Sequence, residues 1–235
     1  MTIVIVLAKA PVPGRVKTRL TPPLTADQAV SIAAAALDDT FRAVLAATRS
    51  SGTVAVFDGD PSPWVPHSVG TIAQVGGGLD RRLAAAFRDV HALHRDPMVL
   101  VAMDTPQVTA AMLDEAIDAL ARPEVDAVFG QADDGGYWLI GLRALNPDES
   151  SYDALFHDVP MSTDETGAAQ RNRLVSSGWR VLDVGRLRDI DTIDDIIAVA
   201  NAEPHLAVTK AWRKIERRLC ESAPLDLAPP DAKSS

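Results

Sequence analysis

Two apolar runs of strand length constrain the fold of this chain more than any other feature. Residues 2–8 (TIVIVLA) and 98–103 (MVLVAM) are almost uninterrupted in apolar side chains. Such runs, without polar alternation, are typical of strands that are buried on both faces, as in parallel sheets covered by helices. Further strands are predicted at 53–57, 71–74, 125–130, 137–142 and 179–184.

Helical patterns fill the segments between these strands. Thr25 with Gln28 has the spacing of a capping box and predicts the start of a long helix. The alternation of strands and helices predicts an α/β fold: one Rossmann-like domain over residues 1–203, with a mostly parallel, mixed sheet and helices on both faces. The other helix signals are an apolar spacing at 79–93, a cap at Thr109, a second capping box at Ser162 and Glu165 before a helix that ends at Gly178, and a cap at Thr192.

Composition and charge narrow the classes of function. The chain has 235 residues, of which 47% are hydrophobic, enough for one large core. Its formal net charge of −9 argues against nucleic acid as a partner, because phosphate backbones need a positive surface. Cys220 is the single cysteine, which excludes an intrachain disulfide. No apolar run approaches the roughly 20 residues of a membrane span, and no basic segment precedes the first strand, so a cytoplasmic protein is expected.

The C-terminal segment predicts a basic amphipathic helix within residues 204–222. Val208, Trp212, Ile215 and Leu219 share one face, and lysines and arginines occupy the others. Three alternatives stay open for the apolar face: packing on its own domain, packing on a second subunit in a homodimer, or peripheral contact with an anionic membrane. Residues 223–235 have the composition of a disordered tail.

A basic loop, residues 9–20 (KAPVPGRVKTRL), follows the first predicted strand. It carries Gly14, which permits close backbone approach, and four cations at Lys9, Arg15, Lys17 and Arg19. Backbone amides with lysine and arginine side chains suit a diphosphate or triphosphate. The loop is not a Walker A motif, which has different spacing. A solvated basic loop is the alternative.

Acidic residues follow two other predicted strands. Asp104 ends the second apolar run and is well placed to hold Mg²⁺ or Mn²⁺ through oxygen, although it could also cap a turn. In residues 189–195 (DIDTIDD), Asp194 and Asp195 suit the positive end of a helix. Asp191 precedes the cap and has no such role, so it is a candidate for the second metal ligand.

A fourth segment, residues 130–137 (GQADDGGY), joins two predicted strands. Its paired glycines permit close backbone approach, and its paired aspartates could bind sugar hydroxyls or act as a base. Asp-Gly is equally an ordinary hairpin turn. Both interpretations are compatible.

Together these motifs resemble the GT-A superfamily of nucleotide-diphospho-sugar transferases and nucleotidyltransferases. The pattern AKAPVPGRVKTRL, DTP, GQADDGGYWLIGL, MST and DIDTIDD runs from Ala8 to Asp195 and is most similar to a bacterial glycosyltransferase-like family, sometimes linked to arsenosugar biosynthesis. There are two departures. Gln131 stands where the family pattern usually has a proline. Asp104 is a single acid, whereas many metal-dependent glycosyltransferases have an Asp-x-Asp motif, and a single metal-binding aspartate is more similar to nucleotidyltransferases.

The resemblance implies a metal-dependent transferase that acts on a nucleoside-phosphate donor, foremost a glycosyltransferase that uses a nucleotide-sugar and a small acceptor. A nucleotidyltransferase that joins a nucleoside triphosphate to a phosphorylated or acidic acceptor is the alternative, and a non-catalytic nucleotide-binding domain is the second. The predicted residues are Ala8, Lys9, Gly14, Arg15, Lys17, Thr18 and Arg19 for the nucleotide; Asp104 and Asp191 for Mg²⁺ or Mn²⁺; Lys17, Asp104 and Asp134 for catalysis; and Asp133, Gly135, Gly136, Tyr137, Ser162 and Thr163 for the substrate.

Overall fold

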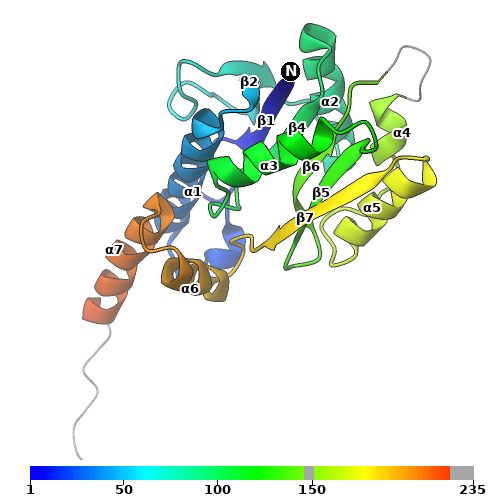
Figure 1. Ribbon diagram of the computed structural model, residues 1–235. Coiled ribbons are helices and arrows are strands. Elements are labelled where there is room, and N and C mark those ends of the chain that lie inside the picture. Colours follow the sequence, from blue (N-terminus) through cyan, green and yellow to red (C-terminus); the bar gives the residue numbers. More distant parts are fainter. Residues whose placement is uncertain (146–150, 223–235) are drawn as a thin grey trace, which may run out of the picture.

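A single mixed sheet forms the centre of the chain in a computed structural model that describes residues 1–145 and 151–222 (Figure 1). Within these residues the sheet has seven strands in the order β3-β2-β1-β4-β6-β5-β7. Only β6 runs antiparallel to its neighbours, β4 and β5, and the other neighbouring pairs are parallel. The predicted mixed, mostly parallel sheet is confirmed. The strands are β1 (Thr2–Lys9), β2 (Ser50–Asp58), β3 (Gly70–Ala73), β4 (Met98–Ala102), β5 (Ala127–Ala132), β6 (Tyr137–Leu142) and β7 (Val181–Leu187).

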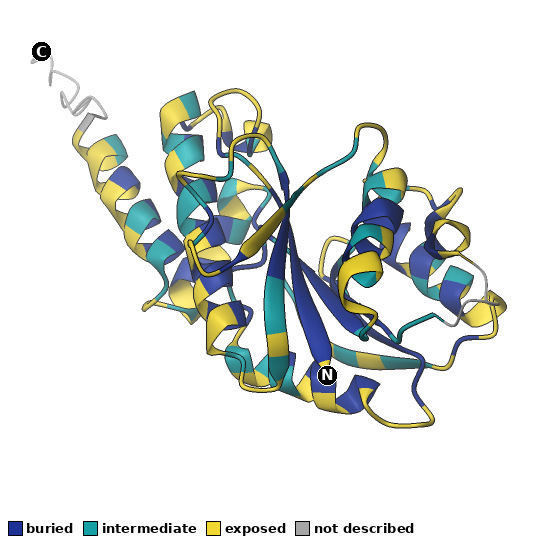
Figure 2. Cartoon of the chain, turned by 90° about the horizontal axis from the view of Figure 1, so that it is seen from above, coloured by how far each residue is buried: buried dark blue, intermediate teal, exposed yellow. Residues whose placement is uncertain are grey.

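Helices cover both faces of the sheet. Helices α1 (Ala26–Ala46) and α3 (Ala110–Leu120) pack on one face, and α2 (Leu79–His94), α4 (Tyr152–Phe156) and α5 (Thr166–Ser176) pack on the other. The sheet has a hydrophobic core on each face, and alternate residues of β1 belong to one or the other: Val4 and Val6 face α1, and Ile5 faces α2. Figure 2 shows the central strands buried between the two helical layers. The uninterrupted apolar run in β1 is therefore explained by burial on both sides.

Most predicted helix starts are confirmed, and one is wrong. Thr25 accepts the backbone hydrogen of Gln28 in a full capping box, and Thr109 and Thr192 also cap helices. The predicted capping box at Ser162 and Glu165 does not form, because Ser162 has a left-handed φ of 62°. The helix instead begins at Thr166, after a turn in which the Thr163 hydroxyl accepts the backbone hydrogen of Glu165. Helix α4 and the short helix η1 (Thr18–Leu20) were not predicted.

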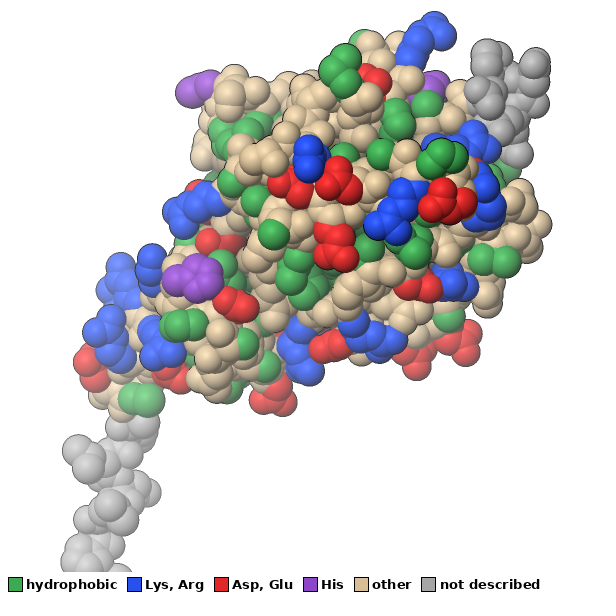
Figure 3. Space-filling model, viewed as in Figure 1, with side chains coloured by type: hydrophobic (Ala, Val, Ile, Leu, Met, Phe, Trp, Pro, Cys, Tyr) green, Lys and Arg blue, Asp and Glu red, His purple; other side chains and the backbone are tan. Residues whose placement is uncertain are grey.

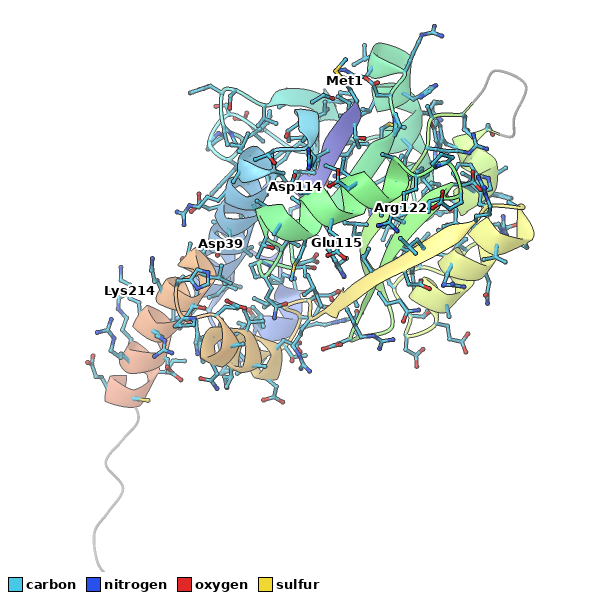
Figure 4. All side chains as sticks on the ribbon, viewed as in Figure 1. Met1, Asp39, Asp114, Glu115, Arg122 and Lys214 are labelled. Atoms are coloured by element: carbon cyan, nitrogen blue, oxygen red, sulfur yellow. The ribbon has the colours of Figure 1, made fainter. Side chains whose placement is uncertain are left out.

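The C-terminal helix α7 (Ala207–Ser222) packs on its own domain. Trp212 and Ile215 are buried against α1 and α6 (Ile193–Ala202). Asp39 on α1 accepts the backbone hydrogens of Ala207 at 2.8 Å and of Val208 at 2.9 Å, and so caps α7 (Figure 4). Of the three alternatives for the apolar face, the structure shows packing on its own domain, because α1 and α6 cover that face. Residues 223–235, predicted as a disordered tail, lie outside the described residues.

The outer surface of α7 is basic, and Lys and Arg side chains gather over this end of the molecule (Figure 3). Its exposed basic residues are Lys210, Arg213, Lys214, Arg217 and Arg218. Among the described residues, no helix is both long and apolar enough to cross a membrane.

Asp126, beside the start of β5, provides a test of the fold. Its carboxylate accepts hydrogen bonds from Arg180 Nε at 2.7 Å, from the Arg180 backbone at 2.9 Å and from Arg143 Nε at 2.9 Å. These bonds, those from Arg180 first, lower the pKa of Asp126 from 3.8 to about 2. Its negative charge therefore stabilises the folded state above pH 4, and this contribution is lost as pH falls towards 2.

We expect Asp126→Asn to lower the free energy of unfolding at pH 7 by about 2 kcal/mol, because charged hydrogen bonds are lost. The difference from the wild-type protein should shrink between pH 4 and pH 2. Urea unfolding at pH 7 and pH 3 measures both. Asp118→Asn is the control, since Asp118 and its partner Arg49 are both more than half exposed, and it should change the stability by less than about 0.5 kcal/mol. A difference for Asp126→Asn that is equal at both pH values would contradict this account.

Candidate nucleotide and metal site

A pocket of about 620 Å³ opens at the carboxyl ends of β1 and β4. Ligands of open α/β sheets collect at this edge. Leu7, Leu83 and Leu100 form apolar parts of its wall. The polar wall comes from five segments: Lys9, Lys17, Thr18 and Arg19 at and after the end of β1; Asp104 after β4; Asp134, Gly136 and Tyr137 at the β5–β6 turn; Ser162, Thr163, Asp164 and Thr166 before and at the start of α5; and Asp189, Asp191, Thr192 and Asp195 after β7.

Lys17 lies between two carboxylates at the centre of the polar wall. Its Nζ atom is 3.4 Å from Asp104 Oδ2 and 3.2 Å from Asp191 Oδ1. Arg19 Nη1 lies 3.0 Å from Asp191 Oδ2. The two loops that carry the aspartates are joined by a backbone hydrogen bond from Ile190 to the Asp104 carbonyl at 3.0 Å. The predicted convergence of the basic loop and Asp104 on one cavity is therefore what the structure has.

The backbone around Lys17 directs its side chain inwards. Lys17 has a φ of 46°, which is uncommon for a residue with a side chain, and the buried residues Val16 and Leu20 anchor the loop on either side of it. Its side chain is only 8% exposed. Burial lowers the pKa of Lys17, but the charges of Asp104 and Asp191 outweigh this effect and raise the pKa above its ordinary value. Lys17 is therefore a fully charged, buried cation.

Asp189 lines the pocket, although the sequence did not predict it as a site residue. Its Oδ1 atom is buried and accepts no hydrogen bond from the described part of the chain. Burial, together with the negative charges of Asp104, Asp134 and Asp191, raises the pKa of Asp189 to about 7. The available signal was its position directly after β7, two residues before Asp191. Asp164 and Thr166, which also line the pocket, carried no comparable signal.

The β5–β6 turn packs tightly against the start of α5. A Cβ atom on Gly135, whose φ is 91°, would lie 2.0 Å from the Asp164 carbonyl oxygen. The Gly167 backbone donates to the Gly135 carbonyl at 2.7 Å. Asp134 Oδ1 accepts the Gly136 backbone hydrogen at 2.8 Å, which fixes this carboxylate at the pocket wall. The paired glycines thus serve both the turn and the close approach of α5.

The hydroxyl of Tyr137 is buried and has no hydrogen-bond partner among the residues that the structure describes. Burial raises the pKa of Tyr137, so the hydroxyl stays protonated. Because buried polar groups in native proteins are nearly always paired, a water molecule or a ligand group that reaches the hydroxyl from the pocket would satisfy it.

We expect Tyr137→Phe to leave the melting temperature unchanged or slightly raised, because no hydrogen bond within the protein is lost. The same variant should bind its donor or acceptor about tenfold more weakly. Thermal unfolding and ligand titration of one preparation measure both. A lower melting temperature with unchanged ligand affinity would show a purely structural role.

The pocket contains eleven of the sixteen predicted site residues, and five lie outside its lining. Lys9, Lys17, Thr18, Arg19, Asp104, Asp134, Gly136, Tyr137, Ser162, Thr163 and Asp191 line the pocket. Ala8, Gly14, Arg15, Asp133 and Gly135 do not. Ala8 is buried within β1, Gly14 and Arg15 are exposed, and Asp133 pairs with Arg188 at 3.3 Å. Gln131, which replaces the usual proline, lies at a bulge of β5 and accepts a hydrogen bond from Arg186.

The donor set fits a hard divalent cation. Mg²⁺ is commonly bound by one or two carboxylates, with phosphate and water as the other ligands. Asp104 and Asp191 direct one oxygen each to a single point, and that point already holds a positive charge, the Lys17 ammonium. Among the residues that the structure describes, no group of three or more His, Cys, Asp or Glu side chains is arranged as a metal site. A metal ion held by Asp104 and Asp191 would therefore need further oxygen ligands from a bound phosphate or from water.

Sequence comparison assigns the chain to a family. Residues 31–163, more than half of the 235, match the family model described as "Uncharacterized protein conserved in bacteria (DUF2064)". The chain belongs to the DUF2064 family. No functionally curated protein matches the sequence.

Several solved structures share the fold of this DUF2064 protein. A protein from Desulfovibrio desulfuricans G20, assigned to the nucleotide-diphospho-sugar transferases, has a TM-score of 0.81 at 22% identity, over 94% of this chain and 97% of that one. A cytidylyltransferase from Leptospira borgpetersenii serovar Hardjo-bovis has a TM-score of 0.53 at 12% identity, over 97% and 99%. CMP:2-keto-3-deoxy-manno-octonic acid synthetase, in complex with CTP, has a TM-score of 0.53 at 10% identity, over 94% and 99%. The predicted resemblance to the GT-A-like superfamily is confirmed at the level of the fold.

Proposed function

We propose that this DUF2064 protein is a metal-dependent transferase that acts on a nucleoside-phosphate donor, foremost a glycosyltransferase that uses a nucleotide-sugar. The observation that carries the proposal is the meeting of Lys17, Arg19, Asp104 and Asp191 at one pocket at the carboxyl end of the sheet. The fold of the structural neighbours supports it, although fold alone does not determine function.

The basic loop would hold the phosphates of the donor. Lys17 and Arg19 lie side by side on Asp191, and Arg19 is 70% exposed, so its guanidinium is free to turn towards an anion. Guanidinium and ammonium groups that face a departing phosphate stabilise the negative charge that develops there. A divalent ion at Asp104 and Asp191, Mg²⁺ or Mn²⁺, would supply further positive charge for the leaving diphosphate.

The part of the pocket formed by the β5–β6 turn and the start of α5 would receive the acceptor. Its described lining residues, Asp134, Ser162, Thr163, Asp164 and Thr166, include two carboxylates and no cation. Such a wall repels a phosphorylated or acidic acceptor and suits the hydroxyl groups of a neutral one. Asp134 is held in place by the Gly136 backbone and is the candidate base for an acceptor hydroxyl. This charge distribution favours glycosyl transfer over nucleotidyl transfer to an acid.

Nucleotidyl transfer remains the second candidate because the metal position has a single acid, Asp104, after β4 instead of paired acids. Two of the structural neighbours with this fold also use or make nucleotides: a cytidylyltransferase and the synthetase in complex with CTP. In that reaction Lys17 and Arg19 would neutralise charge on the α-phosphate and on departing pyrophosphate. The link to arsenosugar biosynthesis stays a prediction.

Product analysis separates these functions. The protein is incubated with Mg²⁺ or Mn²⁺ and either nucleotide-sugars or nucleoside triphosphates, and released diphosphate or pyrophosphate is measured. We expect a nucleoside diphosphate from a nucleotide-sugar in the presence of an uncharged acceptor. Release of pyrophosphate from a triphosphate would support the second candidate. Binding without any turnover would instead support a non-catalytic nucleotide-binding domain.

A further inference from the structure

The Lys17 ammonium lies between the two carboxylates of the candidate metal site. The ammonium is within hydrogen-bonding distance of one oxygen from each of Asp104 and Asp191, at 3.4 Å and 3.2 Å. These oxygens are the same pair that would hold a divalent cation. An ammonium group and a divalent cation repel each other and cannot share this space.

Lys17 is held there by burial and charge together. Its side chain is 8% exposed, and the partner side chains of Asp104 and Asp191 are each 34% exposed. Without Lys17, the two carboxylates would face each other with Arg19 as the nearest cation that the structure pairs with either of them. The ammonium therefore offsets one of the two negative charges of this pair.

We propose that Lys17 is the internal occupant of the metal position, so that a divalent cation binds weakly alone and tightly together with a polyphosphate that receives the displaced ammonium. The inference rests on the proposed function and concerns how its site is filled. The pocket next to Lys17 is lined by Thr18 and Arg19 of the same loop, where an anion would lie. Because the polyphosphate stabilises the displaced ammonium, the cation and the anion strengthen each other's binding.

Mn²⁺ alone, without nucleotide, tests the inference. Free Mn²⁺ is measured by electron paramagnetic resonance during titration of the wild-type protein, Lys17→Met and Lys17→Gln. Loss of the competing ammonium should strengthen Mn²⁺ binding at least about tenfold in both variants. Mn²⁺ should also raise the melting temperature of both variants more than that of the wild type, since it replaces the missing positive charge. Lys214→Met, which removes an exposed lysine of α7, should bind Mn²⁺ as the wild type does.

Mn²⁺ binding that is equal or weaker in both Lys17 variants, or absent in all proteins, would overturn the inference. If the variants do not fold, crystals of the wild-type protein in Mn²⁺ decide the question. Anomalous scattering should then place Mn²⁺ between Asp104 and Asp191, with the Lys17 ammonium displaced from at least one of them. Mn²⁺ in that position, with Lys17 still bonded to both aspartates, would also overturn it. Failure of the proposed function would appear separately, as a wild-type protein that binds no nucleotide.

Discussion

Replacing Asp104 with asparagine is expected to lower turnover about 100- to 1000-fold, the range observed when one stabilising group is removed from an active site. The substitution keeps the shape of the side chain but removes one of the two negative charges that meet at the Lys17 ammonium. The protein should remain folded, because Lys17 keeps its contact with Asp191 at 3.2 Å. The rate of product formation at saturating donor and metal concentrations measures the change, and circular dichroism verifies the fold.

Asp183→Asn is the matched control for this experiment. Asp183 lies in β7 and pairs with Arg171 of α5, outside the lining of the pocket. The control removes one carboxylate and one ion pair, and its turnover should stay within about twofold of the wild type. Full turnover in Asp104→Asn would contradict a role for this carboxylate in the reaction.

Replacing Gly135 with alanine is expected to have the largest effect on stability. The added Cβ would lie 2.0 Å from the Asp164 carbonyl oxygen, and the residue also has a φ of 91°. Both the clash and the left-handed backbone oppose the substitution, so we expect the free energy of unfolding to fall by about 3 kcal/mol or more. The β5–β6 turn and the start of α5 form one wall of the pocket, so ligand binding should weaken as well.

Gly178→Ala separates the clash from the backbone effect. Gly178 has a φ of 84°, similar to that of Gly135, but an added Cβ would meet no atom within 4 Å. This control should lose only about 1 kcal/mol, the usual cost of a left-handed residue with a side chain. Urea unfolding of both variants measures the difference, and equal losses would show that the contact between the turn and α5 is not tight.

Local chemistry made much of the fold predictable. Thr25, Thr109 and Thr192 cap helices where the sequence places them, because a side-chain oxygen next to an apolar helical pattern satisfies free backbone amides. The apolar run of β1 predicted burial on both faces. Ser162 shows the limit of this reasoning. Ser162 has a left-handed backbone instead of capping a helix. The turn that follows it packs against the β5–β6 turn at Gly135, and a tertiary contact of this kind cannot be inferred from a local capping sequence.

Most of the predicted site residues line the pocket, but their contacts with one another could not be predicted from the sequence. Strand ends indicated that Lys17, Asp104 and Asp191 lie at one edge of the sheet. The sequence does not indicate that the ammonium bonds both carboxylates, because that depends on the left-handed backbone at Lys17 and on the hydrogen bond between Ile190 and Asp104. The sequence likewise does not indicate that a carboxyl oxygen of Asp189 is buried without a partner among the described residues, because that depends on how the chain folds.

Calorimetric titration with nucleoside diphosphates and nucleotide-sugars, in Mg²⁺ and in EDTA, tests the central claim most directly. The claim is that one pocket binds a polyphosphate through Lys17 and Arg19 and a cation through Asp104 and Asp191. We predict binding of at least one of these ligands in Mg²⁺, with much weaker binding in EDTA and in Arg19→Ala. Nucleotide binding that is indifferent to Mg²⁺ and to Arg19, or no binding of any nucleotide, would contradict the claim.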